Sequence, residues 1–227
     1  MPDWDSLVRG LAAYTFFHTS AWCRVLAESY GYRPMYFTTW QEKGLRAMVP
    51  MMEVRSPLTG RRGVSLPFSD YCAPLLSDDG DFAPLLAAIQ DHGRMGGWKF
   101  IELRGEAPGL SGQQPSSSYI GHRLDLSEGI EKVERALRDS TRRNIRRAEK
   151  SGVRVRFSRS MEGIRAFYRL NCLTRRRHGL PPQPLRFFER FFLHVIDPGL
   201  GSMVLAEHKG EIIAAAVFVT TNERDGT

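Results

Sequence analysis

The sequence of 227 residues has only three cysteines, and no two of them are neighbours. Cys23, Cys72 and Cys172 are odd in number and form no CxxC pair, which argues against a disulfide framework and against a zinc site. The cysteine usage therefore predicts a protein without a bound metal, located in a reducing compartment such as the cytoplasm.

Long hydrophobic runs are also absent. The longest apolar run, Ile212–Val219, is far shorter than the roughly 20 residues that a membrane-spanning helix requires. The N-terminus has no charged segment followed by an apolar one, so no secretory signal is predicted. With 42% hydrophobic and 25% charged residues, the composition is that of a globular protein without a transmembrane segment, and its charge leaves peripheral contact with a membrane open.

Acidic residues are scarce in one segment, residues 135–156. This segment holds nine arginines and lysines but only two acids, Asp139 and Glu149, while the rest of the chain has 23 basic and 23 acidic residues. The net charge of +7 is therefore local, and like charges one helical turn apart repel each other. A solvated helix face remains one interpretation, but the pattern favours an anionic ligand.

The same segment has no aromatic residue between Ser140 and Val155. Proteins that bind single-stranded nucleic acid interleave aromatic and basic side chains, so this absence argues against that class. Contact with the phosphate backbone of a duplex or a tRNA stays open.

Periodicity predicts two series of helices and strands on either side of a Gly-, Pro- and Ser-rich linker, Glu106–Ser118. In the first series we expect helices at Thr19–Tyr30 and Phe82–Met95, and strands at Pro34–Trp40, Leu45–Arg55, Gly63–Leu66 and Trp98–Arg104, the first two joined by a turn at Gln41–Gly44. In the second we expect strands at Tyr119–Leu126, Val153–Phe157, Gly201–His208 and Glu211–Thr220, and helices at Ile130–Lys150, Met161–His178 and Pro184–Ile196.

Both series place a helical region before a β-hairpin, which indicates a duplicated α+β unit. We expect one domain at residues 1–118 and a second at 119–227 that includes the basic helix 130–150. The second series stops at Asn222–Thr227, where its sheet would keep an open edge, so we expect the second domain to be incomplete.

Several stretches in this order resemble the FemAB-type family of peptidoglycan-bridge aminoacyltransferases and related acyltransferases. They are TFFHTSAWCRVLAESYGYRP, AMVPMMEVRSPLTGRRGVSLPFSDYCAPLL, STRRNIRRAEKSGVRVRF, FYRLNCLTRRRHGLPPQPLRFFERFF and VLAEHKGEIIAAAVFV. The resemblance implies tandem GNAT-like (acyl-CoA N-acyltransferase-like) domains, with mixed sheets flanked by helices. It also implies transfer of an acyl or aminoacyl group to an amine of a cell-wall precursor, without a tightly bound cofactor.

The donor stays open at this stage. Acetyl-CoA enzymes of the GNAT superfamily bind pyrophosphate with an R/Q-x-x-G-x-G/A loop, and the glycine-containing stretch His92–Gly97 has the wrong spacing for it. Both acyl-CoA and aminoacyl-tRNA therefore remain candidate donors.

The resemblance makes the basic helix a candidate for acceptor binding. Arg142, Arg143, Asn144 and Arg146 would hold the diphosphate or the carboxylates of an anionic acceptor, either a small molecule or a lipid-linked precursor. Arg176, at the basic end of another helix, either complements the helix dipole or contacts substrate.

The stretch LPFSDYCAP, Leu66–Pro74, carries the candidate catalytic residues. Asp70 would act as a general base or orient the attacking amine, Tyr71 would donate a hydrogen bond to the carbonyl oxygen, and Ser69 would contact substrate. The alternative is an ordinary turn with a local Asx hydrogen bond. No histidine stands near Cys72 in the sequence, so we expect no thiol nucleophile there, and His18 is expected to cap or pack.

These observations predict an acyl- or aminoacyltransferase that uses no metal. The alternative is a non-catalytic module in which the basic helix binds phosphate groups of RNA. An inactive piece of an enzyme is a further alternative.

Overall fold

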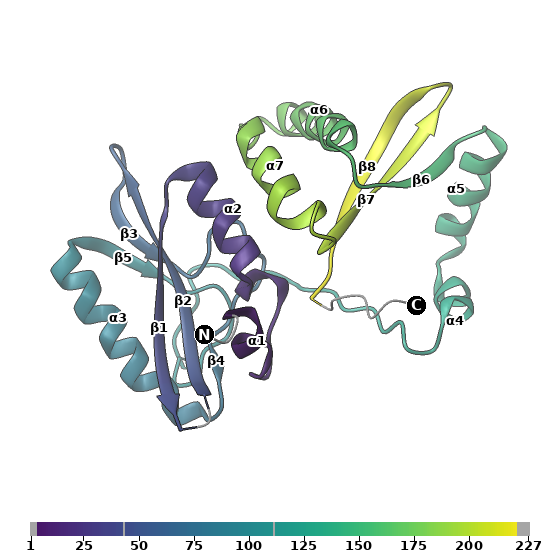
Figure 1. Cartoon of the computed structure of the whole chain (residues 1–227). Coiled ribbons are helices and arrows are strands. Elements are labelled where there is room, and N and C mark those ends of the chain that lie inside the picture. The colour runs from purple at the N-terminus through teal and green to yellow at the C-terminus, as the bar shows by residue number, and fades with distance from the viewer. Residues whose placement is uncertain (1–3, 43, 111, 222–227) are drawn as a thin grey trace.

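The structure, a computed structural model, describes residues 4–42, 44–110 and 112–221. Two β-sheets lie apart from each other, each with its own helices, and an extended segment joins them (Figure 1). This arrangement confirms the α+β class expected from the sequence.

The first sheet has the strand order β1-β2-β3-β5, with the short β4 paired to β2. The strands are β1 (Arg33–Gln41), β2 (Gly44–Ser56), β3 (Gly60–Val64), β4 (Leu75–Leu76) and β5 (Trp98–Glu102). β1 and β2 form the predicted hairpin, although Lys43 in its turn lies outside the described residues. Because β3 and β5 run parallel while the other pairs are antiparallel, this sheet is mixed, as expected.

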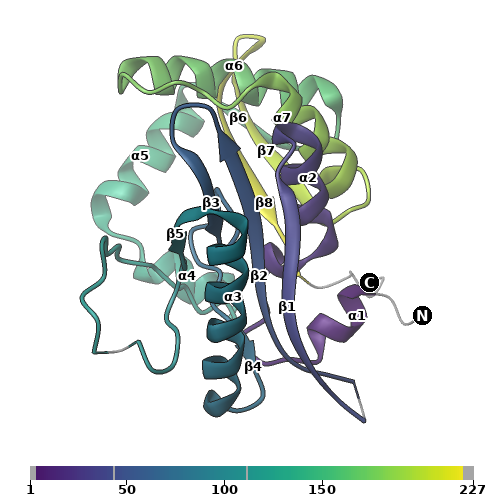
Figure 2. The ribbon, with the colours of Figure 1, turned by 90° about the vertical axis from the view of Figure 1, so that its left-hand side faces the viewer.

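Both faces of the first sheet are covered. Helix α3 (Phe82–Gly96) packs against one face through Phe82, Leu85 and Ile89, and lies along the strands (Figure 2). Helices α1 (Trp4–Arg9) and α2 (Ser20–Tyr30) cover the other face. The strand β2 lies between them and is buried over most of its length.

The chain from residue 112 to residue 129 is exposed and contains no helix or strand. The predicted strand Tyr119–Leu126 is therefore wrong: Tyr119 is 91% exposed, and no described strand pairs with this stretch. Alternation of apolar residues favours a strand. A strand forms, however, only where its backbone groups pair with those of a neighbouring strand.

The predicted helix Ile130–Lys150 is two helices, α4 (Ile130–Ala136) and α5 (Asp139–Lys150). Leu137 and Arg138, the two residues between these helices, have extended backbone angles. Neither helix has a buried residue, so no packing enforces one continuous helix. Asp139 favours a new start instead, because a carboxylate in the first turn complements the helix dipole.

The second sheet is antiparallel over the described residues, with the order β6 (Arg154–Ser158), β7 (Gly201–His208) and β8 (Glu211–Val219). Helices α6 (Met161–Arg177) and α7 (Leu185–Phe191), followed by a π-helical turn at Phe192–Ile196, cover one face. The other face is exposed at Phe157 and Phe218, which are 76% and 59% accessible.

The two halves meet through aromatic side chains. The Trp22 ring of α2 contacts Phe187 and Phe191 of α7, with centroid distances of 6.0 and 6.5 Å. The carboxylate of Glu28 adds an ion pair with Arg190 at 3.3 Å. One hydrophobic core therefore extends from α2 across to α7 and the second sheet.

Candidate functional site

Helix α5 presents a cationic concavity. Its lining consists of Asp139, Arg142, Arg143 and Arg146, and its volume is about 550 Å³. Residues three or four apart share one helix face, which is why the sequence spacing brings these side chains together. The prediction that these three arginines could act on one ligand is compatible with this geometry.

Only one of the three arginines in the concavity has a carboxylate partner. Arg142 donates from Nη2 to Asp139 Oδ1 at 2.8 Å, while within the described part of the chain Arg143 and Arg146 form no ion pair. The spacing of three residues between Asp139 and Arg142 places the two side chains on one face of the helix, which explains this pair. Two guanidinium groups are thus available for an anion.

The other predicted binding residues lie outside this concavity. Asn144 is exposed on α5 but does not line it, and Arg176 is exposed in the last turn of α6. Their contact with substrate stays a prediction.

Arg104 fixes the loop that carries the candidate catalytic residues at two points. The Arg104 guanidinium donates from Nη1 to the Ser69 carbonyl at 3.0 Å, and the Ser65 hydroxyl accepts from the Arg104 amide at 2.7 Å. Leu66 and Phe68 adopt positive φ angles of 58° and 61°. Strained backbone of this kind persists where surrounding contacts fix it.

Within this loop, Asp70 and Tyr71 are exposed, whereas Ser69 is buried. The Ser69 hydroxyl donates to the Leu66 carbonyl at 2.6 Å, so it closes the turn. The Phe68 ring contacts Phe187 of α7 at a centroid distance of 6.0 Å. The loop therefore lies where the two halves of the chain meet, although it does not line the α5 concavity.

His18 is buried behind this loop and caps a helical turn with Thr15, as expected, but its contact with Cys72 was not expected. Cys72 Sγ is 3.6 Å from Nε2 of His18, a residue far away in the chain. Nδ1 of His18 accepts from the Thr15 amide at 3.1 Å, so the neutral ring carries its proton on Nε2 and donates it to the Ala73 carbonyl at 2.9 Å. His18 is thus no base for Cys72, and burial raises the pKa of that thiol to about 12. Both residues hold the loop rather than react.

The buried His18 should make stability depend on pH. Burial lowers its pKa below the ordinary 6.5, outweighing the hydrogen bonds to Ala73 and Thr15. Below pH 6.5 the unfolded chain therefore binds a proton that the folded chain resists. We expect the contribution of His18 to the free energy of unfolding, measured by urea titration, to be constant above about pH 6.5 and to fall as the pH drops below it.

A matched pair of variants isolates this effect between pH 5.5 and 7.5. His18→Gln should flatten the pH dependence, whereas His122→Gln, a change at an exposed histidine, should leave it as in the parent protein. An unchanged slope in His18→Gln would assign the dependence to other groups.

Over residues 4–42, 44–110 and 112–221, no three His, Cys, Asp or Glu side chains gather closely enough to hold a metal ion. In the same residues, no helix combines the length and the apolar character needed to cross a membrane.

Comparison with known proteins agrees with this architecture. Residues 135–224 match a family model described as an acetyltransferase (GNAT) domain. Among solved structures, FemX matches with a TM-score of 0.62 and 15% sequence identity, over 90% of this chain and 56% of the FemX chain. No curated protein matches the sequence.

The match to FemX extends over both sheets, whereas the family model begins in α4 and covers α5 and the second sheet. The arginine concavity thus belongs to the segment that the family model describes. By sequence, residues 135–224 are similar to a GNAT-type acetyltransferase domain, and the chain shares the fold of FemX, which confirms the GNAT-like α+β architecture expected from the resemblance to the FemAB-type family.

Proposed function

We propose that this protein is an N-acyltransferase that moves an acyl or aminoacyl group to an amine of an anionic acceptor, such as a cell-envelope precursor in the cytoplasm. The observation that carries this proposal is the α5 concavity within the GNAT-type segment, with two guanidinium groups that lack a carboxylate partner in the described chain. We also propose that residues 1–118 and residues 119–227 form two separate domains.

The acceptor would bind through its phosphates or carboxylates. The planar guanidinium groups of Arg143 and Arg146 form paired hydrogen bonds with such oxyanions more readily than a lysine would. The arginines line one face of α5 that is open to solvent, so more than one anionic group of the acceptor could contact them. Asn144 would extend the binding surface on α5, and Arg176 would extend it on α6.

In the transfer, the acceptor amine loses a proton and attacks the carbonyl carbon of the donor. The C–N bond forms as the bond to the leaving thiol or ribose hydroxyl breaks, and the leaving group takes up a proton. Asp70 would orient the amine or accept its proton, and Tyr71 would donate to the developing oxyanion. Their exposure on a pinned loop where the two halves meet supports these roles.

Two donors remain candidates, and each has separate support. The similarity of residues 135–224 to an acetyltransferase domain favours acyl-CoA. The resemblance to the FemAB-type family favours aminoacyl-tRNA, whose backbone could also contact the arginines of α5.

Incubation of the purified protein with a nucleotide-linked muramyl pentapeptide and either acetyl-CoA or a mixture of charged tRNAs tests the proposal. Mass spectrometry should detect an acceptor heavier by the donated group in one of the two reactions. Asp70→Asn should lower kcat about tenfold or more, while Asp91→Asn, at an exposed site on α3, should not.

The alternative, a non-catalytic module that binds RNA phosphates, predicts a different outcome. It would give no product with either donor, and duplex RNA would bind with an affinity that falls steeply with salt. That pair of results would contradict the transferase proposal.

A further inference from the structure

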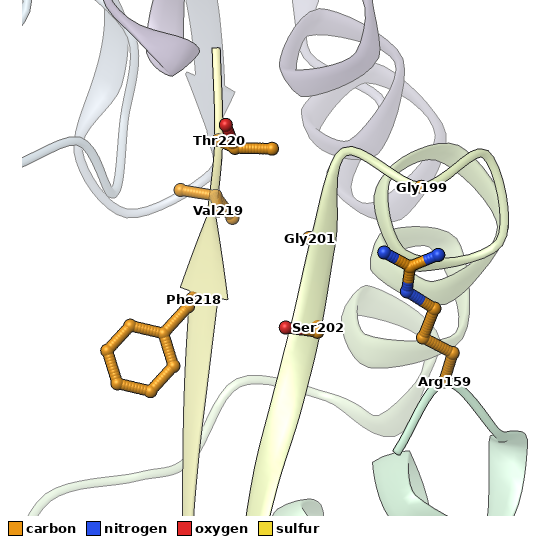
Figure 3. A pocket seen from close by; sticks show the side chains of 7 residues that line it. All are labelled: Arg159, Gly199, Gly201, Ser202, Phe218, Val219 and Thr220. Atoms are coloured by element: carbon orange, nitrogen blue, oxygen red, sulfur yellow. The ribbon is translucent and has the colours of Figure 1, made fainter. Parts of the chain in front are cut away.

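A second, smaller cavity lies at one end of the second sheet, and the proposed transfer does not use it. Its volume is about 200 Å³, and it shares no lining residue with the α5 concavity. Arg159 follows β6, Gly201 begins β7 and Phe218 lies near the end of β8, so three strand ends surround it (Figure 3).

Among the described residues that line this cavity, Arg159 is the only one with a charged side chain. Its side chain is exposed, and among the described residues its guanidinium group forms neither an ion pair nor a hydrogen bond. In Figure 3 the guanidinium group extends from the end of β6 toward the segment that leads into β7. Within the described part of the chain, none of its five N–H donors is engaged by another protein group.

Two glycines line the cavity, and one of them, Gly199, lies beside this guanidinium group. A Cβ on Gly199 would lie 3.8 Å from Arg159 Nη1, and Gly199 has a φ of +89°, which disfavours any side chain there. A Cβ on Gly201 would lie 2.7 Å from the Phe218 carbonyl oxygen. The backbone itself thus lines part of the cavity.

The remaining lining combines the hydroxyl groups of Ser202 and Thr220 with apolar groups. Ser202 and Phe218 are directly opposite each other in the β7–β8 ladder, so their side chains share one face of the sheet. The Ser202 hydroxyl can donate one hydrogen bond, and Phe218 and Val219 supply apolar contact. A planar cation, hydroxyl groups and an apolar wall in a small volume suit one oxyanion group on a short carbon chain.

We propose that this cavity is a second anion site, which binds a single carboxylate or phosphate group. Arg159 would bind two oxygens of the group through its guanidinium fork, and Ser202 would donate a third hydrogen bond. Its small volume separates it from the α5 concavity, which has space for a larger polyanion.

Titration of the ¹⁵N-labelled protein with inorganic phosphate, and separately with acetate, at constant ionic strength tests the proposal by NMR. The amide signals of Gly199 and Gly201 should shift in a saturable manner with at least one of the two anions. Saturation by phosphate alone would define a phosphate site, and saturation by acetate alone a carboxylate site. Linear shifts with both would overturn the proposal.

Matched variants assign the effect to the cavity. Arg159→Gln should weaken the binding detected at Gly199 and Gly201 about tenfold or more, because it removes a charged bidentate contact. Arg165→Gln makes the same charge change at an exposed position on α6 and should leave the affinity unchanged. Equal weakening in both variants would mean that the overall charge of the protein causes the effect. That result would contradict a specific anion site in this cavity. Signals from α5 are separate in the same spectra, so this result is independent of the transferase proposal.

Discussion

With Arg143 and Arg146 both replaced by glutamate, we expect the KM for the anionic acceptor to rise by about 100-fold or more. A hydrogen bond to a charged group contributes about 1.5–3 kcal/mol, and every 1.4 kcal/mol is about a factor of ten in affinity. Steady-state kinetics with the product detected by mass spectrometry measures the change. The fold should persist, because α5 contains no buried residue.

The double variant Arg147→Glu with Lys150→Glu is the matched control. It makes the same change of charge on the same helix, but neither residue lines the concavity. We expect its KM to change far less than that of Arg143→Glu with Arg146→Glu. Equal changes in the two variants would mean that the overall charge of α5 matters and the concavity does not.

The largest effect on stability is expected from Trp22→Ala. Trp22 is 4% exposed and joins the two halves through Phe187 and Phe191. Truncation of a buried tryptophan costs about 3–5 kcal/mol. Urea unfolding should therefore show a clearly lower midpoint.

Trp40→Ala provides the comparison, since Trp40 is 56% exposed on β1. We expect it to change the free energy of unfolding by about 1 kcal/mol at most. A similar loss in both variants would show that the contact between α2 and α7 adds little to stability.

Local patterns made much of the fold predictable. The strand-forming stretches of the β1–β2 and β7–β8 hairpins and the amphipathic spacing of α2 and α3 are local properties of the sequence, and the structure has all of them close to the expected bounds. The strand expected at Tyr119–Leu126 was wrong because strands depend on partners elsewhere in the chain. The single helix expected from Ile130 to Lys150 was wrong because periodicity does not reveal that neither half is packed.

The candidate site was predictable to a similar extent. The arginines of α5 share a concavity because helical spacing alone brings them together. In contrast, His18 behind Cys72 and Arg104 across the Ser69 turn lie close to them only in the folded chain. No spacing in the sequence signals such contacts between distant segments.

The exposed segment 112–129 has a consequence for how the molecule is assembled. It packs against neither half, while Trp22, Phe187 and Phe191 hold the halves together directly. The connection therefore acts as a tether that raises the local concentration of one half near the other, and it sets no angle between them. Changes in the length or composition of this tether should leave the loop of Asp70 and helix α7 in the same relative position.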